Sequence, residues 1–153
     1  NLAGYADVLT PNLTEACLLT QTNYLKNPTD RQLTELLAKL KQLQSPNGKA
    51  VITGIVRHGR ISCCWLEETK LMSLESQRLL GHFYGSGDAF AALLTGFLWQ
   101  GYGWSKAVQI SAKLLYATLQ QQQNEPDTQR RFGIKLDFLL PQLLKTLTKK
   151  TAK

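Results

Sequence analysis

The chain has 153 residues, of which 43% are hydrophobic and 19% are charged, and its formal net charge is +7. These values are typical of one soluble globular domain, and no apolar run approaches the roughly 20 residues that span a bilayer. The charge excess lies in residues 106–153, where nine Lys and Arg outnumber three acids. It is diffuse and matches no nucleic-acid-binding motif, so we expect a solvated basic face and tail, with neither a nucleic acid nor a membrane as partner.

The first residues and the cysteines indicate the setting of the protein. No basic region followed by an apolar one opens the chain, so we expect no signal peptide. The chain begins with Asn1 rather than Met, which suggests a fragment or a processed product. Cys17, Cys63 and Cys64 are odd in number and have no C-x-x-C spacing. This pattern indicates neither a disulfide framework nor a zinc site. We expect the three cysteines to be buried packing residues, and the protein to lie in a reducing, cytoplasmic compartment.

The first third of the chain predicts a short strand followed by two helices. Residues 6–10 are predicted as the strand, and Asn12 can cap the first helix. A loop at residues 23–30 comes next, and Thr29 or Asp30 can cap the second helix. The second helix carries a stripe of leucines that is expected to face a core: Leu33, Leu36, Leu37, Leu40 and Leu43.

The middle of the chain predicts a β-hairpin. Residues 50–56 form a continuous apolar, β-branched run, which is typical of a strand buried on both faces of a parallel sheet. His58 and Gly59 signal a two-residue turn, and residues 60–67 alternate as a second strand nearer the sheet edge. Residues 71–83 remain ambiguous between strand and loop.

The last part of the chain predicts three helices. The first runs from Gly85 to about Gln100, and the second starts at Trp104 or Ser105. One face of the second helix is expected to carry Val108, Ala112, Leu115 and Leu119. A polar loop at residues 125–131, a helix at residues 138–147 and a basic tail complete a single α/β unit over residues 1–153. The few predicted strands form too small a sheet to bury the leucine faces of the helices, which also suggests that the chain is a fragment.

A glycine-flanked corner at the start of the third predicted helix is the first of three candidate functional features. Gly85, Ser86 and Gly87 run directly into Asp88 at the helix start. Free backbone N–H groups and the helix dipole suit a phosphate at such a place, and the aspartate can take a proton from an attacking hydroxyl. The alternative is an ordinary loop with an acid near a helix N-terminus, where acids are common.

Two further features lie at or within the predicted strands. Asn12 and Glu15 offer an amide and a carboxylate to Mg²⁺ and its waters, or else they form a capping box. Thr53 and Gly54 lie inside the apolar run, where a glycine suggests a bulge or the close approach of another group. The hydroxyl of Thr53 can bind a phosphate, or the threonine is there simply for packing.

The order of these motifs carries a resemblance. T-P-N-x-x-E after one strand, V-I-T-G in the next and G-S-G-D-A-F at a helix start resemble the C-terminal part of the ribokinase-like kinases, and most of all the pyridoxal kinases, up to about residue 122. The resemblance implies an α/β fold with a mostly parallel sheet flanked by helices. It also implies ATP-dependent phosphorylation of the hydroxymethyl group of pyridoxal or a related B6 vitamer. Alternatives are a hydroxymethylpyrimidine or sugar kinase of the same superfamily, or a non-catalytic fragment that binds nucleotide or assembles with a partner.

The resemblance also implies roles at the glycine-flanked corner. Asp88 matches the catalytic base, and the N–H groups of Gly85, Ser86 and Gly87 match the anion hole for the transferred phosphoryl group. Related hydroxymethylpyrimidine kinases often carry Cys where this chain has Asp88, so the aspartate favours pyridoxal as substrate.

The nucleotide-binding roles that the resemblance implies fall on six other residues. Asn12 and Glu15 would organise Mg²⁺, through water, and the ATP phosphates. Thr53 and Gly54 would contact ATP, although pyridoxal kinases commonly have Ser where this chain has Gly54. The residues expected at the adenine pocket are Phe83 and Leu119.

The family's N-terminal half, which supplies the vitamin pocket and the dimer-forming lid, does not match any part of this chain. We therefore expect a homodimer for the full-length protein, and no phosphorylation of pyridoxal by this chain alone.

Overall fold

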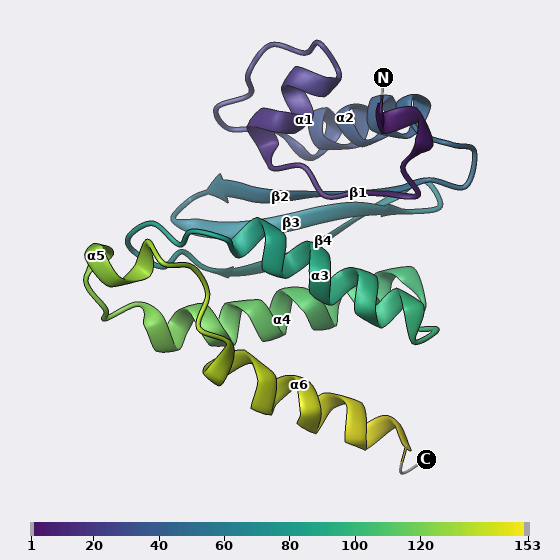
Figure 1. Ribbon diagram of the computed structural model, residues 1–153. Coiled ribbons are helices and arrows are strands. Elements are labelled where there is room, and N and C mark those ends of the chain that lie inside the picture. Colours follow the sequence, from purple (N-terminus) through teal and green to yellow (C-terminus); the bar gives the residue numbers. More distant parts are fainter. Residues whose placement is uncertain (1, 152–153) are drawn as a thin grey trace. The chain divides into compact units, whose positions relative to one another are not determined.

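The computed structural model describes residues 2–151 and has a mixed α/β fold (Figure 1). Its elements in chain order are a 3-10 helix Leu2–Tyr5, β1 Val8–Leu9, α1 Leu13–Leu19, α2 Asp30–Leu43, β2 Lys49–Arg57, β3 Arg60–Glu67, β4 Lys70–Gln77, α3 Ser86–Trp99, α4 Trp104–Gln122, α5 Asp127–Arg130 and α6 Leu136–Thr151. The last two residues of the predicted basic tail, 152 and 153, lie outside the described residues.

The chain divides into two compact units, Asn1–Arg78 and Leu79–Lys153. The N-terminal unit contains the sheet with α1 and α2, and the C-terminal unit contains α3 to α6. A single α/β unit over residues 1–153 stays a prediction.

The sheet of the N-terminal unit has the order β1-β2-β3-β4 (Figure 1). The α/β class is confirmed, but only β1 and β2 are parallel, and the other two pairs are antiparallel. The reason is the turn at His58 and Gly59, whose φ angles of 48° and 74° are those of a tight hairpin turn that reverses the chain. A second reversal follows at Glu68, which has a φ of 54°.

Several predicted bounds change in the structure. The strand expected at residues 6–10 is reduced to β1, and the ambiguous stretch at 71–83 contains most of β4 followed by a loop. The loop expected at 125–131 contains the short helix α5. The final helix, α6, extends beyond the predicted 138–147 and includes Pro141 in its interior.

The leucine stripe of α2 forms the core of the N-terminal unit. Thr29 caps this helix: its hydroxyl accepts from the N–H of Gln32, and the side chain of Gln32 accepts from the N–H of Thr29. Four of the five predicted leucines are buried, and Leu43 is half-buried. They pack with residues of α1, β2 and β3, namely Leu13, Ala16, Cys17, Ile52, Ile55 and Cys64.

The C-terminal unit is a group of packed helices in which α4 contacts both α3 and α6. The predicted apolar face of α4 is only partly right, because Val108 is buried but Ala112, Leu115 and Leu119 are half-buried. The face that is buried includes three polar residues, which hid it from the pattern: Ser111, Thr118 and Gln122. Within residues 2–151, no helix combines the length and the apolar character needed to cross a membrane.

All three cysteines are free and buried, which confirms the expectation that they are packing residues. Burial raises the pKa of the Cys63 and Cys64 thiols to about 12, because desolvation disfavours the thiolate. The thiolate is the reactive form, so both side chains are chemically inert in the folded protein.

Replacing Leu40, which is 0% exposed, with alanine should lower the free energy of unfolding by about 2–5 kcal/mol. The matched control is Leu18→Ala, since Leu18 is 74% exposed and its truncation removes little buried area. Urea unfolding followed by circular dichroism measures both changes. Equal losses for the two variants would contradict the assignment of the core.

Iodoacetamide should not label Cys63 and Cys64 in the native protein from pH 8 to about pH 9.5. An ordinary thiol with a pKa of about 8.5 becomes mostly thiolate over that range and is labelled. Labelling in urea provides the control, because unfolding exposes all three thiols to the reagent. Mass spectrometry of the labelled peptides gives the result. If either cysteine in the native protein is labelled as fast as in urea, its thiol is accessible and the predicted burial is wrong.

Candidate functional site

The candidate residues of the N-terminal unit meet where β1 ends. The N–H of Thr53 donates to the carbonyl oxygen of Pro11 over 2.9 Å, and Asn12 pairs with Thr53 as an isolated parallel bridge. The parallel ladder therefore continues past β1 and places Asn12 beside the Thr53-Gly54 segment, although 40 residues of sequence separate them. The Thr53 hydroxyl is 3.4 Å from the same carbonyl oxygen.

Gly54 introduces the bulge that the sequence predicts. Its φ is +67°, and the pairing register of β2 with β3 shifts between Ile52 and Ile55. A Cβ at position 54 would lie 3.8 Å from the Cβ of Asn12, which is ordinary contact. The left-handed backbone, rather than lack of space, is what favours glycine here.

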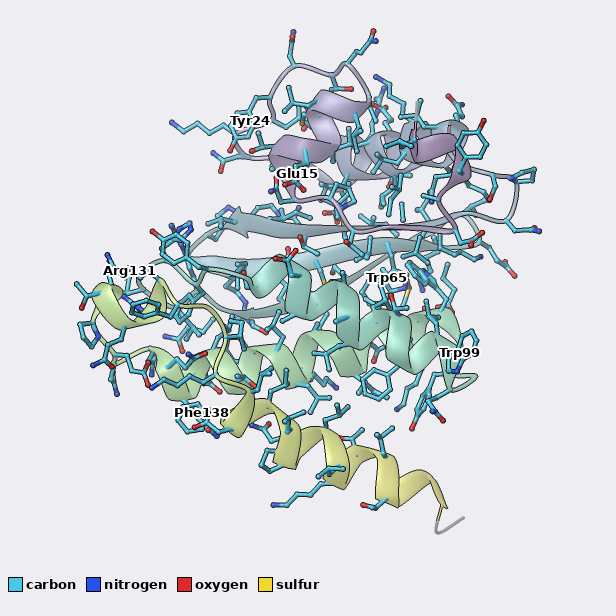
Figure 2. The ribbon with its side chains drawn as sticks, in the orientation of Figure 1. Glu15, Tyr24, Trp65, Trp99, Arg131 and Phe138 are labelled. Atoms are coloured by element: carbon cyan, nitrogen blue, oxygen red, sulfur yellow. The ribbon has the colours of Figure 1, made fainter. Side chains whose placement is uncertain are left out.

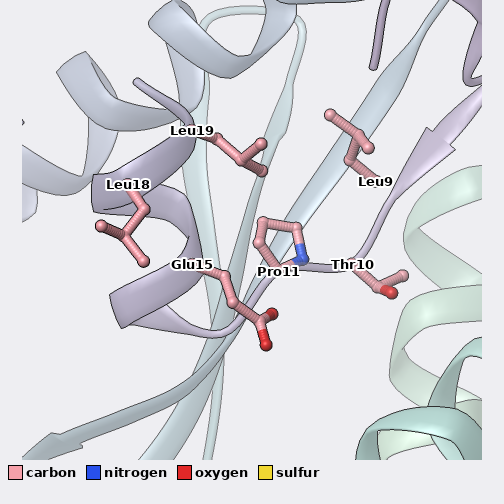
Figure 3. A pocket seen from close by; sticks show the side chains of 6 residues that line it. All are labelled: Leu9, Thr10, Pro11, Glu15, Leu18 and Leu19. Atoms are coloured by element: carbon pink, nitrogen blue, oxygen red, sulfur yellow. The ribbon is translucent and has the colours of Figure 1, made fainter. Parts of the chain in front are cut away.

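Asn12 and Glu15 form a capping box at the start of α1, as the structural alternative predicts. The amide oxygen of Asn12 accepts from the N–H of Glu15, and Oε2 of Glu15 accepts from the N–H of Asn12, both over 2.9 Å. The second carboxylate oxygen takes no part in the box. Figure 3 shows the Glu15 carboxylate beside Pro11 and Thr10, at a hollow of about 440 Å³ that is otherwise lined by leucines.

Two residues that the sequence motifs do not indicate also lie beside this group. Tyr24 and Lys26 line a second hollow, of about 210 Å³, together with Asn12 and Gly54. Figure 2 shows Tyr24 on the loop that follows α1. Both residues belong to the stretch at 23–30 that was interpreted only as a connection. The basic residue in that loop was the available signal, but its proximity to Gly54 depends on the fold.

The candidate residues of the C-terminal unit lie at the start of α3. Gly85 is the N-cap residue with a φ of 74°, and no side chain caps this helix end. The first N–H groups of an α-helix have no partner within the helix, so those of Ser86 and Gly87 are available to an anion. A Cβ built on Gly87 meets no atom within 4 Å, which shows open space at this turn.

Asp88 lies in the same first turn and is exposed. Among the described residues its carboxylate has no hydrogen-bond or ion-pair partner. A carboxylate that is not paired within its own unit can accept a proton from a hydroxyl brought to it. Its role as a base remains a prediction.

Phe83 and Leu119, expected at an adenine pocket, are both half-buried in the C-terminal unit. The guanidinium carbon of Arg130 lies over the Phe83 ring, 5.0 Å from its centroid. Leu119 lies on α4 beside the buried Thr118. Their contact with a nucleotide remains a prediction.

The donors of the N-terminal group fit a magnesium ion that keeps most of its waters. Glu15 and Asn12 offer side-chain oxygen atoms, the ligands that Mg²⁺ prefers. Both side chains also accept a hydrogen bond in the capping box. No cluster of three or more His, Cys, Asp or Glu that could hold a metal occurs among residues 2–151. Two oxygen ligands from the protein suit an ion that keeps most of its waters.

The variant Asn12→Ala should lower the free energy of unfolding by about 1 kcal/mol, because α1 loses its side-chain cap. Asn12→Ser keeps a capping oxygen and should retain most of that stability. Urea unfolding midpoints compare the two variants with the parent chain. Equal losses for Ala and Ser would show that the capping box adds nothing to stability.

Known proteins are similar to this chain over most of its length. The sequence profile of the phosphomethylpyrimidine kinase family matches residues 1–131. The chain is similar to the crystal structure of pyridoxal kinase from Lactobacillus plantarum, with 33% identity and a TM-score of 0.80, over 95% of this chain and 52% of that one. Among curated protein sequences none matches.

Two further structures extend this similarity. A putative phosphomethylpyrimidine kinase from Bacteroides thetaiotaomicron has 29% identity and a TM-score of 0.81, over 90% of this chain and 48% of that one. The Bacillus subtilis pyridoxal kinase, solved as an ADP complex, has 28% identity and a TM-score of 0.66, over 76% of this chain and 45% of that one. The chain thus spans about half the length of these kinases. It belongs to the phosphomethylpyrimidine kinase family, and its fold is that of the matching half of the pyridoxal kinases.

Proposed function

We propose that this chain is the nucleotide-binding and catalytic half of an ATP-dependent kinase that phosphorylates the hydroxymethyl group of pyridoxal or a related B6 vitamer. The observation that carries the proposal is the start of α3, where an uncapped helix end, a left-handed glycine and an exposed aspartate follow one another. The whole activity is a proposal, because the chain spans only about half of the kinases it resembles.

The chemistry assigned to the start of α3 is phosphoryl transfer to an alcohol. Asp88 accepts the proton of the substrate's hydroxymethyl group while the oxygen of that group bonds to the γ-phosphorus of ATP. The bond between the γ-phosphorus and the oxygen that bridges to the β-phosphate breaks, and ADP is released. The N–H groups of Gly85, Ser86 and Gly87 stabilise the negative charge on the transferred group. The positive end of the α3 dipole adds to this field.

The N-terminal group is assigned to the nucleotide phosphates and their metal. Asn12 and Glu15 would hold Mg²⁺ through water, and Thr53 and Gly54 would contact ATP. When bound, the metal neutralises phosphate charge. Lys26, in the same hollow as Gly54, adds a positive charge to this part of the unit.

Two related structures support the choice of ligands. The Bacillus subtilis pyridoxal kinase was solved with ADP. The Bacteroides thetaiotaomicron protein, called a putative phosphomethylpyrimidine kinase, was also solved with pyridoxal, and it is 28% identical to this chain with a TM-score of 0.78. We extend these ligands to the complete kinase, together with the homodimer that the resemblance implies.

The second candidate function is phosphorylation of a hydroxymethylpyrimidine. The family profile that matches residues 1–131 carries that activity in its name. Asp88, at a position where hydroxymethylpyrimidine kinases often have Cys, is the reason for placing pyridoxal first. Assays with both alcohols as acceptors separate the two candidates, and nucleotide binding without turnover on either would indicate a silent binding protein.

In the complete kinase that contains this chain, Asp88→Asn should lower kcat by about 10²–10⁴-fold and leave ADP affinity unchanged, because only the proton acceptor is lost. Pyridoxal-dependent ADP release and calorimetric ADP titration give the two quantities. Asp137→Asn is the matched control, since Asp137 is also an exposed acid in the first turn of a helix. Unchanged turnover in Asp88→Asn would remove the base assignment.

A further inference from the structure

The C-terminal unit contains a buried arginine that the proposed chemistry does not use. Arg130 ends α5, and its side chain is only 9% exposed. Arginine is rarely buried without partners, because the charged group loses its hydration. The partners of Arg130 therefore indicate what the burial achieves.

The guanidinium of Arg130 joins two segments that are far apart in sequence. Nη1 donates to the carbonyl oxygens of Leu80, over 3.1 Å, and Gln123, over 3.3 Å. Nη2 donates to the carboxylate of Asp127, and the whole group lies over the ring of Phe83. One rigid fork thus ties the loop before α3 to the end of α4 and to α5.

The loop before α3 is shaped around this guanidinium. Gly81 has a φ of +97°, and a Cβ built there would lie 2.3–2.5 Å from the guanidinium atoms of Arg130. The arginine therefore fills the space that a side chain at position 81 would need. Position 81 therefore favours glycine for two reasons: the backbone has a positive φ, and the guanidinium occupies the place of a side chain.

A second contact lies closer to the helix start. A Cβ built on Gly85 would lie 3.9 Å from the Cα of Gly133, and the buried Gln122 donates through its amide to the carbonyl of Gly133 over 3.5 Å. The segment that follows α4 therefore holds the loop at Leu80 through Arg130, and its Gly133 lies close to Gly85 at the other end of the loop.

We propose that Arg130 is a positioning residue, which holds residues 79–84 in place and so sets the direction in which the α3 N-terminus presents Gly85 to Asp88. Lysine cannot replace it, because one ammonium group has neither the planar fork nor the flat face that the two carbonyls and Phe83 require. The catalytic meaning of this role rests on the proposed function, but the holding of the loop does not.

Amide hydrogen exchange of the 153-residue chain tests the holding role. Arg130→Ala and Arg130→Lys should speed exchange in residues 79–85 by about tenfold or more, while buried amides of α4 keep their rates. Arg131→Ala is the matched control, since the neighbouring Arg131 is exposed (Figure 2) and its guanidinium carbon lies over the ring of the exposed Phe132, 5.1 Å from the centroid. Unchanged exchange in residues 79–85, or an equal increase throughout the C-terminal unit, would overturn the proposal.

Calorimetric titration with ADP tests the consequence for binding. Both Arg130 variants should weaken ADP binding by about tenfold, because residues 79–84 carry Phe83, which is expected at the adenine pocket, and Arg131→Ala should not. If the parent chain binds no ADP, the proposed nucleotide site fails, while the exchange result still decides the role of Arg130. If an Arg130 variant loosens residues 79–84 but binds ADP as tightly as the parent chain, the proposed link between Arg130 and nucleotide binding is overturned.

A double-mutant comparison covers the case in which Arg130→Ala alone folds poorly. Gly81→Ala should shift the urea midpoint strongly in the parent chain, where the new methyl group meets the guanidinium, and less in an Arg130→Lys background. The strain from the positive φ is common to both backgrounds and cancels. Equal shifts would show that the guanidinium does not shape the loop.

Discussion

The short parallel pairing between β1 and β2 is the contact on which the candidate site of the N-terminal unit depends. It continues as the bond from Thr53 to Pro11 and leaves Asn12 opposite Thr53, where the capping box then turns the chain into α1. A register shift of one residue would turn the side chain of Thr53 to the other face of the sheet. Backbone hydrogen bonds thus place Asn12 beside Gly54, and the side-chain bonds of the capping box place Glu15 next to Asn12.

The two candidate groups are built by the same means. Each has a left-handed glycine: Gly54 lies at the bulge in β2, and Gly85 lies at the start of α3. Each has an exposed carboxylate in the first turn of the following or adjoining helix, Glu15 or Asp88. Phosphoryl transfer needs positioning and charge neutralisation more than covalent chemistry from the protein, and main-chain groups fixed by glycine geometry are suited to that need.

The sequence predicts the elements whose signals are local. Thr29 and Asn12 cap helices as expected, and the turn at His58 and Gly59 forms the hairpin, because caps and tight turns depend on a few neighbouring residues. The sequence leaves β4 ambiguous between strand and loop, because its turn uses Glu68 in a left-handed conformation without a glycine signal. The buried face of α4 was misjudged because it carries polar residues, and the neighbours of Asn12 beyond Glu15 come together only through the fold.

The edges of the sheet have a consequence for the behaviour of this chain in solution. An unpaired strand edge can recruit another chain by backbone hydrogen bonding. β1, at one end of the sheet, offers only two residues, Val8 and Leu9, and Pro11 soon follows with no N–H to donate. β4, at the other end, is longer, but Lys70 begins it and Glu75 pairs with Arg60 across its face. Ordered growth of the sheet by stacking copies edge to edge is therefore disfavoured at both ends, and concentrated samples should resist β-type fibre formation.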